Sequence, residues 1–174
     1  MILQKEIQTY IKSPAFLFVT KIDLDANYFI KRIQQGVKGK DNKNYETNVK
    51  SQMTSWNYFK EDKVFHEQIC LPSMDIVQSK IRTNESAFTL ELQNAWGIKQ
   101  EKNEKTIKHN HIKCYFSGAV YLNDCDQPLY FDEIQQEINP EKGLLVLFSG
   151  NLQHYTTRNK SNTKYSLAFN YAQN

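Results

Sequence analysis

The sequence predicts a mainly β fold with N-terminal helices, whose core is a double-stranded β-helix of the jelly-roll or cupin-like kind. Two observations lead to this prediction. From Ala87 onward the chain consists of short apolar segments separated by turn residues, and two helix-like patterns precede them. Many short strands of this kind are typical of double-sheet jelly rolls. Such a barrel holds a ligand in its open mouth.

The length of the chain favours one domain, and its charge does not indicate a nucleic-acid partner. A chain of 174 residues can bury roughly 70% of its unfolded surface around a single core. We therefore predict a single domain over residues 1–174. Residues 1–86 form a mixed α/β support region, and residues 87–174 form the jelly-roll core with the metal site. The 22 Lys and Arg residues balance 19 Asp and Glu residues, so nucleic acid is not indicated as a partner.

The cysteines and the hydropathy pattern indicate where the protein works. Cys70, Cys114 and Cys125 are odd in number and lack a CxxC spacing, which favours reduced thiols in a cytosol. The first residues lack the apolar region of a signal peptide, and no stretch approaches the roughly 18 apolar residues of a membrane span. We expect a cytoplasmic protein with no membrane partner. The Lys- and Asn-rich composition fits an AT-rich phage genome, in which case the cytoplasm is that of the host.

The first half predicts one strand and two helical regions. The strand covers Phe16–Ile22. Asp25 is placed to cap a helix whose apolar residues follow the 3.6 period, and Gly36 is its stop. The second helical region covers Val64–Arg82 and is expected to be broken near Pro72, since proline lacks a backbone N–H.

The second half predicts only strands. A half-buried strand begins where Phe88, Leu90 and Leu92 alternate with polar residues. Further strands are expected, each followed by a turn signal or another break in the apolar pattern, at Thr106–Ile112, Cys114–Leu122, Pro128–Phe131, Gly143–Phe148, His154–Thr157 and Tyr165–Tyr171.

The histidines of the second half indicate a metal site. His109 and His111 are two residues apart in a predicted strand, so their side chains should project from the same face. His154 would add a third imidazole from a neighbouring strand. Three imidazoles on one side of a metal leave the opposite positions open, as in non-haem Fe(II) sites, although imidazole also binds zinc, copper or nickel.

Each histidine has a simpler interpretation when taken alone. An isolated His-x-His pair on a strand is more often a surface or hydrogen-bonding pair than a metal site. The presence of Lys164 ten residues after His154 reverses that preference, because a buried dicarboxylate needs a cation at its far end. His66, the remaining histidine, lies in a helical segment and is expected to be structural.

With these residues the chain resembles the 2-oxoglutarate/Fe(II)-dependent oxygenases, specifically the prolyl-4-hydroxylase-like group with many phage and marine bacterial members. The resemblance covers Trp96–Asn170, and a further block at Thr47–Trp56 is similar to phage members. Within the larger block it rests on the order and spacing of His109–His111, Ser117–Leu122, Pro128–Phe131, Gly143–Ser149, His154 and Lys164–Asn170.

The resemblance implies roles for individual residues. It implies that His109 and His154 are iron ligands. Tyr121 matches a tyrosine that hydrogen-bonds the distal carboxylate of 2-oxoglutarate. Lys164 falls where the family usually has an arginine paired with that carboxylate, and Ser166 matches the serine two residues later.

The chain departs from the family pattern at two positions. The usual pattern is His-x-Asp, but His111 occupies the place of the carboxylate. The site would then carry one negative charge less, unless a carboxylate outside the motif reaches the metal, for which the candidates are Asp124, Asp126 and Asp132. In the second departure, Lys164 supplies a point charge in place of the two-pronged guanidinium of arginine.

We therefore expect an enzyme, a 2-oxoglutarate-dependent dioxygenase that uses Fe(II) and 2-oxoglutarate and hydroxylates a protein side chain or a small molecule. Contacts with this primary substrate are expected at Val37–Asn48 and Met53–Trp56. Two alternatives stay open: a three-histidine metal dioxygenase that does not use 2-oxoglutarate, and a non-catalytic jelly-roll binding module.

Overall fold

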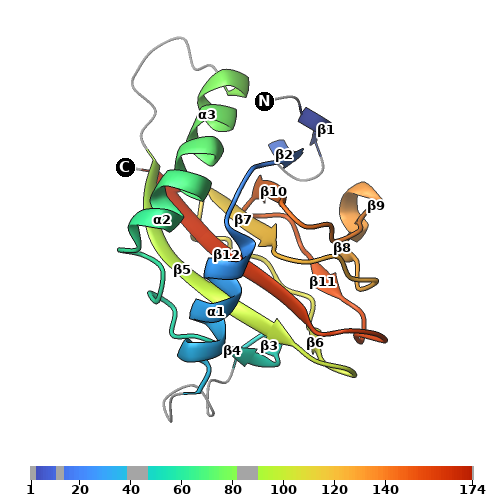
Figure 1. Ribbon diagram of the computed structural model, residues 1–174. Helices are drawn as coiled ribbons and strands as arrows, with labels where there is room; N and C mark the ends of the chain where they lie inside the picture. Colours follow the sequence, from blue (N-terminus) through green and yellow to red (C-terminus); the bar gives the residue numbers. More distant parts are fainter. Residues whose placement is uncertain (1–2, 11–13, 39–46, 82–89, 174) are drawn as a thin grey trace.

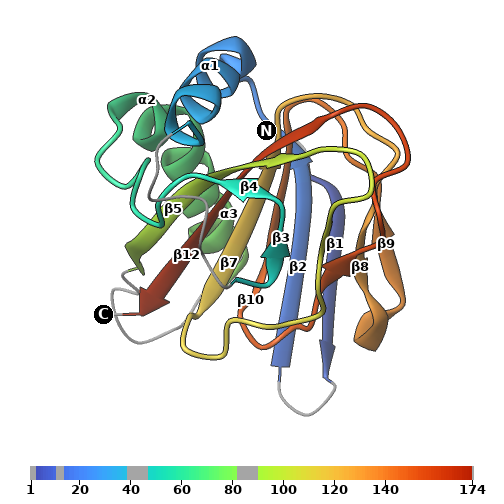
Figure 2. The same ribbon diagram turned by 90° about the horizontal axis from the view of Figure 1, so that it is seen from below.

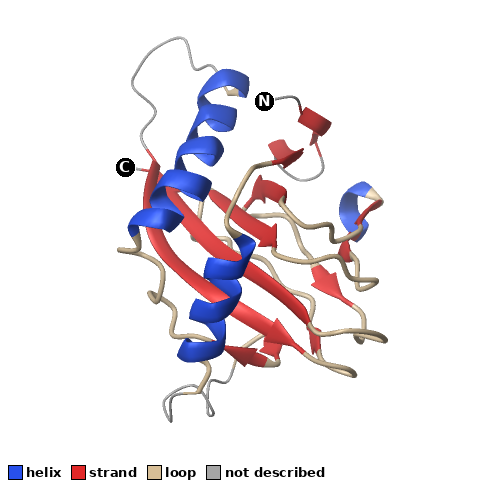
Figure 3. Cartoon of the chain, in the orientation of Figure 1, coloured by secondary structure: helices blue, strands red, loops and turns tan. Residues whose placement is uncertain are grey.

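The computed structural model describes residues 3–10, 14–38, 47–81 and 90–173, in which strand residues outnumber helical ones (Figures 1 and 3). Seven strands form one antiparallel sheet in the order β1-β2-β10-β7-β12-β5-β4. Their bounds are Leu3–Tyr10 for β1, Pro14–Lys21 for β2, Gln52–Met53 for β4, Leu90–Gln100 for β5, Phe116–Tyr121 for β7, Leu144–Ser149 for β10 and Lys164–Gln173 for β12.

Two smaller sheets complete the β structure. One has three strands in the order β11-β8-β9, with β8 at Leu129–Phe131, β9 at Gln136–Ile138 and β11 at Tyr155–Thr156. The other pairs β3 (Val49–Lys50) with β6 (Lys105–Thr106). The three-stranded sheet lies on one side of the large sheet and the helices lie on the other (Figure 2).

The large sheet separates two apolar cores because successive side chains of a strand point to opposite faces. In β2, Phe18 packs into the core beneath the helices, whereas Leu17 and Val19 pack toward the small sheet. In β10, Leu145 and Leu147 belong to the helix side. All five of these side chains are buried, so the continuous apolar runs of the sequence reflect strands covered on both faces.

The first helix forms as the sequence predicts. Helix α1 covers Ala26–Gly36, and the Asp25 carboxylate accepts a hydrogen bond from the backbone N–H of Tyr28 at 3.0 Å. Phe29 and Ile33 of this helix are fully buried against the sheet. The cap, the apolar stripe and the stop at Gly36 are confirmed.

The second helical region is continuous at Pro72, and the expected break there is wrong. Helix α2 (Lys63–Phe65) runs through one π-helical turn, His66–Cys70, directly into α3 (Leu71–Lys80). Pro72 follows the π-helical turn by two residues, where the regular i→i−4 hydrogen-bonding pattern is already interrupted and a missing N–H costs less. No helix in the described part of the chain is long and apolar enough to cross a membrane.

Most of the predicted strands contain an observed strand, and one does not. The exception is Thr106–Ile112, where regular pairing ends at Thr106 and only a single bridge forms at His109. The structure adds β1, β3, β4 and β9, which the sequence patterns did not indicate. Phe88, Arg82 and most of the Val37–Asn48 segment lie outside the described residues.

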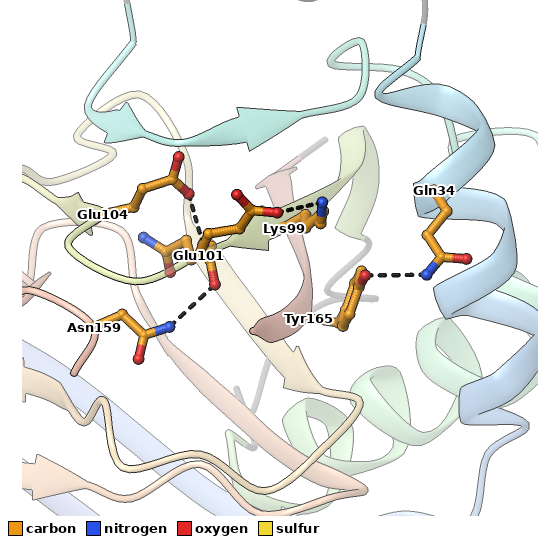
Figure 4. Close-up of polar contacts among 7 residues, drawn as sticks. Gln34, Lys99, Glu101, Glu104, Asn159 and Tyr165 are labelled. Carbon is orange, nitrogen blue, oxygen red and sulfur yellow. Dashed lines mark hydrogen bonds and ion pairs between the residues drawn. The ribbon is translucent and has the colours of Figure 1, made fainter. Parts of the chain in front are cut away.

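The end of β5 is held by polar contacts (Figure 4). The Lys99 ammonium contacts the Glu101 carboxylate at 2.6 Å, and the Glu101 backbone N–H donates to the Glu104 carboxylate at 2.7 Å. The Asn159 side-chain amide donates to the Gln100 carbonyl at 3.1 Å. Gln100 pairs with Lys164 in the ladder between β5 and β12. These contacts therefore hold the part of the sheet from which Lys164 projects.

Gly97 sets how closely α1 approaches the sheet. A Cβ atom at this position would lie 2.3 Å from Cγ1 of Ile33, so Gly97→Ala should destabilise the fold by about 1–3 kcal/mol through overpacking. In an Ile33→Ala background, which removes the opposing atoms, the same change should cost much less. Urea unfolding of the four chains of this double-mutant cycle measures the difference; additive losses would contradict the contact.

Candidate metal centre

Three histidines converge at one end of the barrel. One ring nitrogen each from His109, His111 and His154 lies within 4.8 Å of the other two. The ring centroids are 4.3 Å apart for His109 and His154, and 4.9 Å apart for His109 and His111. In the part of the chain that the structure describes, this is the one group of three or more possible ligands that could hold a metal ion.

The backbone places these histidines in a way that the sequence did not predict. His109 and His154 exchange backbone hydrogen bonds of 3.1 and 2.9 Å in an isolated antiparallel bridge. His111 lies beyond the bridge in a loop, where its N–H donates to the Gly150 carbonyl at 2.7 Å. The prediction that a strand projects both side chains from the same face is therefore wrong, although the two rings do converge. Asn110, between them in the sequence, lines a cavity together with both histidines.

Hydrogen bonds orient two of the rings. Nδ1 of His109 lies 2.8 Å from the Ile107 carbonyl, and Nδ1 of His154 lies 3.2 Å from the Leu152 carbonyl. A carbonyl only accepts, so Nδ1 carries the proton in both rings. Nε2 then keeps its lone pair, as a metal ligand requires, and the carbonyls act as the supporting contacts that usually orient such rings.

The cluster is uncharged at neutral pH. Burial lowers the pKa of His109, while burial and the other two histidines lower that of His154 well below its usual value. Burial and the charge of His109 lower the pKa of His111 to about 4. Neutral imidazole is the form that binds a metal, so these rings need not lose protons at pH 7 to bind one.

The alternative carboxylate ligands are engaged elsewhere. Asp132 contacts the Lys108 ammonium at 2.6 Å, Asp126 accepts a hydrogen bond from Ser161, and Asp124 accepts one from the backbone of Lys142 at 2.8 Å. None of the three belongs to the histidine group. Within the described residues, His111 thus stands where the resembled family has its carboxylate.

The strand register brings three further polar side chains to one face. Ser166 of β12 lies directly opposite Tyr121 of β7 in an antiparallel ladder. Lys164 precedes Ser166 by two residues, so the pleat directs its side chain to the same face. The Lys164 ammonium lies 5.9 Å from the centre of the Tyr121 ring. All three residues line one cavity with the three histidines.

Lys164 is buried without a compensating charge. Its exposed fraction is 2%, and no described carboxylate lies within ion-pairing distance of its ammonium group. Burial therefore lowers the pKa of Lys164 to about 7. Across the described residues, the side-chain polar groups of Lys164, Tyr121 and Ser166 also have no hydrogen-bond partner. Groups left in this state at the floor of a cavity suit a polar ligand.

Several further polar residues of the same cavity were not predicted from the sequence. These residues are Gln100, Thr106, Ser117, Thr156 and Asn170. Asn170 follows Lys164 by six residues on β12, so alternation along that strand could have placed it on the cavity face. The others come from strands whose register is set by pairing partners distant in sequence. Trp96 is 3% exposed and also lines the cavity.

The arrangement of sheets around the cavity is the fold of the 2-oxoglutarate/Fe(II) oxygenases, which confirms the predicted fold class and, at the level of the fold, the resemblance to the prolyl-4-hydroxylase-like group. The viral collagen prolyl hydroxylase of Paramecium Bursaria Chlorella virus-1, solved as a 2-oxoglutarate complex, superposes with a TM-score of 0.66 and 17% identity over 88% of this chain and 96% of that one.

Two other solved structures show the same fold. A prolyl hydroxylase from Trichoplax adhaerens, in complex with a hypoxia inducible factor peptide fragment, has a TM-score of 0.63 and 15% identity, covering 90% of this chain and 83% of that one. HygX from Streptomyces hygroscopicus, with nickel and 2-oxoglutarate bound, has a TM-score of 0.63 and 12% identity, covering 90% and 82%. No family model and no curated protein matches the sequence.

Gly150 allows the histidine loop to approach β10. A Cβ atom at Gly150 would lie 2.1 Å from the Cys114 carbonyl oxygen and 2.6 Å from that of His111. Both are backbone atoms, so Gly150→Ala should displace the loop and weaken divalent-metal binding by at least about tenfold, as expected when supporting contacts of a metal ligand are lost. Calorimetric titration with Co(II) measures this. Unchanged affinity in a folded variant would show that the contact does not position His111.

The buried charge of Lys164 should destabilise the ligand-free fold. Because its pKa falls from 10.5 when unfolded to about 7 when folded, the unfolded chain binds more protons between these values, and stability should rise with pH across that interval. Lys164→Met should stabilise the metal-free chain by roughly 1–4 kcal/mol at pH 7, and the gain should shrink toward pH 10. Urea unfolding at several pH values checks this against exposed Lys160→Met, for which no gain is expected. A loss of stability would contradict the burial of an unpaired charge.

Proposed function

We propose that the protein is an Fe(II)- and 2-oxoglutarate-dependent dioxygenase that hydroxylates a primary substrate, a protein side chain or a small molecule, with release of succinate and carbon dioxide. One observation supports this proposal most directly. A buried lysine without a counter-ion lines the same cavity as a neutral three-histidine cluster. A dicarboxylate that binds a metal at one end and needs a cation at the other matches both features.

The chemistry of the donor set fits a divalent metal. We assign His109, His111 and His154 as the ligands through one nitrogen each, which for His109 and His154 is Nε2 because Nδ1 donates to a carbonyl. Imidazole nitrogens suit iron, and three of them leave positions for further ligands. No carboxylate in the described part of the chain joins the histidine group, so an anionic co-substrate would supply the charge that His-x-Asp sites receive from their carboxylate.

The orphaned polar groups fit the far end of 2-oxoglutarate. We assign Lys164, Tyr121 and Ser166 to its distal carboxylate, which would accept hydrogen bonds from two hydroxyls and the ammonium. Charge-assisted hydrogen bonds to a carboxylate contribute about 1.5–3 kcal/mol each. The same carboxylate would relieve the unpaired charge of Lys164, since a nearby anion favours the protonated amine.

When bound, iron and 2-oxoglutarate activate dioxygen for the hydroxylation of a C–H bond. The side chains of the protein bind and orient the metal and the co-substrate. The carbonyls of Ile107 and Leu152 hold the ring tautomers of His109 and His154, and the polar floor determines which way the co-substrate lies. Leu129 and Phe148 provide an apolar wall of the cavity that limits the entry of water.

The two alternatives differ from this proposal at Lys164. A three-histidine dioxygenase that does not use 2-oxoglutarate would have no need for a cation at the cavity floor. A non-catalytic jelly-roll module would need neither the cation nor the free Nε2 atoms. The cost of keeping Lys164 buried and unpaired therefore favours the first proposal over both.

Anaerobic titration with Fe(II) and then 2-oxoglutarate tests the assignment. We expect the visible charge-transfer band of a chelated keto acid, absent in His154→Ala and retained in the control His66→Ala. His66 lies outside the cluster, with its ring against the Lys60 carbonyl. Lys164→Met should still bind iron, but its affinity for 2-oxoglutarate should fall by about one to two decades, the loss of one charge-assisted bond.

Each alternative has its own result in this titration. Iron binding without the band would favour a dioxygenase that does not use 2-oxoglutarate, and an unchanged affinity in Lys164→Met would exclude the assigned carboxylate site. A chain that binds no iron would favour the binding module. Metal found in the purified protein is a poor guide, because nickel, copper and zinc compete well for imidazole sites.

A further inference from the structure

A second cavity adjoins the first at the histidines. It has a volume of about 210 Å³ and is lined by Thr47, Asn48, Val49, Trp56, Trp96 and Asn110 together with His109 and His111. We call it the tryptophan pocket. Val49, Trp96 and the same two histidines also line the first cavity. A group in the tryptophan pocket would therefore lie beside the proposed metal position, and Lys164 does not line this pocket.

Aromatic faces form one wall of the tryptophan pocket. The rings of Trp56 and Trp96 meet edge to face with centroids 4.6 Å apart. Trp96 packs with Val49 and Met53 in a small apolar cluster separate from the two main cores. Large aromatic faces with a few polar groups around them are typical of sites that bind compact organic groups.

The tryptophan pocket also holds unused hydrogen-bonding groups. Among the described residues, the buried indole N–H of Trp96 has no hydrogen-bond partner, and buried polar groups are rarely left without partners in a complete site. The side-chain amides of Asn48, which is exposed, and Asn110, which is half-buried, make no hydrogen bond to residues 3–10, 14–38, 47–81 and 90–173, so both are open to a ligand. The Thr47 hydroxyl, by contrast, donates to the Val49 carbonyl at 2.9 Å.

We propose that the tryptophan pocket binds the reacting part of the primary substrate, an uncharged group that lays a C–H face on the indole rings and presents an amide or carbonyl to Asn110. This inference rests on the proposed function, since it takes the histidine cluster as the reaction centre. A primary amide both donates and accepts, so Asn110 can pair with the N–H and the C=O of one extended peptide residue through two hydrogen bonds.

The lining explains why the group should be uncharged. Among the described residues, no Lys, Arg, Asp or Glu lines the tryptophan pocket, so an ammonium or carboxylate there would be desolvated without a counter-charge. The first cavity has the opposite character because Lys164 lines it. The two cavities would thus bind ligands of different charge. The anionic co-substrate would bind in the cavity that Lys164 lines, and the neutral substrate in the tryptophan pocket.

Tryptophan fluorescence tests the inference directly, because Trp56 and Trp96 are the two tryptophans of the sequence. The chain is loaded anaerobically with Fe(II) and 2-oxoglutarate and titrated with N-acetyl-leucine N-methylamide, which is neutral. The aspartate and lysine analogues serve as charged probes. We expect a saturable emission change with the neutral probe and at least tenfold weaker binding of both charged probes.

Matched variants locate the response. Asn110→Ala and Trp56→Ala should each weaken binding of the neutral probe at least fivefold. In Trp56→Ala the emission of the remaining Trp96 reports the binding. Asn57→Ala should bind the probe as the parent chain does, because Asn57 is exposed in the segment of Trp56 and does not line the pocket. Equal binding of charged and neutral probes, or a response insensitive to Asn110→Ala, would overturn the inference.

The charge-transfer band of the same sample separates the two proposals. If the band forms and the neutral probe gives no saturable response, the tryptophan pocket is not the substrate site and the proposed co-substrate chemistry stands. If the band does not form, the proposed function fails, and with it the inference that rests on it.

Discussion

The antiparallel ladder between β7 and β12 is the constraint on which the cavity depends. It places Ser166 opposite Tyr121, and Lys164 follows on the same face because side chains alternate along the strand. A slip of β12 by one residue would turn Lys164 and Ser166 toward the helices, away from Tyr121, and direct the apolar side chain of Leu167 to the cavity face. The large apolar core under α1 and α3 therefore holds the register, since it buries Val120, Leu167 and Phe169 on the opposite face.

The histidine end of the cavity is built by a different kind of contact. Here the backbone leaves the regular sheet, and two backbone hydrogen bonds with His154 and one to the Gly150 carbonyl hold the segment from His109 to Cys114. Such a loop is free to place successive side chains on one side, which a pleated strand cannot do. This freedom explains how Asn110 lines the tryptophan pocket between two histidines that line both cavities.

The sequence allowed much of this architecture to be predicted, for identifiable reasons. Apolar segments bounded by turn residues located β7, β10 and β12, and the Asp25 cap located α1. The residues proposed as ligands came from spacing and family resemblance, and the fold brings them to one cavity. The loop geometry at His111 and the continuous helix at Pro72 could not be predicted, because they depend on contacts with Gly150 and on a π-helical turn rather than on local pattern. The tryptophan pocket joins residues about 40 to 60 positions apart in the chain, which no local pattern reveals.

The buried amine of Lys164 has a consequence for charge balance inside the barrel. With a pKa of about 7, a large fraction of the chains is unprotonated in mildly alkaline solution. A carboxylate arriving beside the amine favours its protonated form, so loading draws a proton from the solvent along with the anion. A dianion would then enter together with a proton, and the interior would gain about one negative charge rather than two. Loading and unloading of the barrel would in this way be coupled to proton exchange with the surrounding solution.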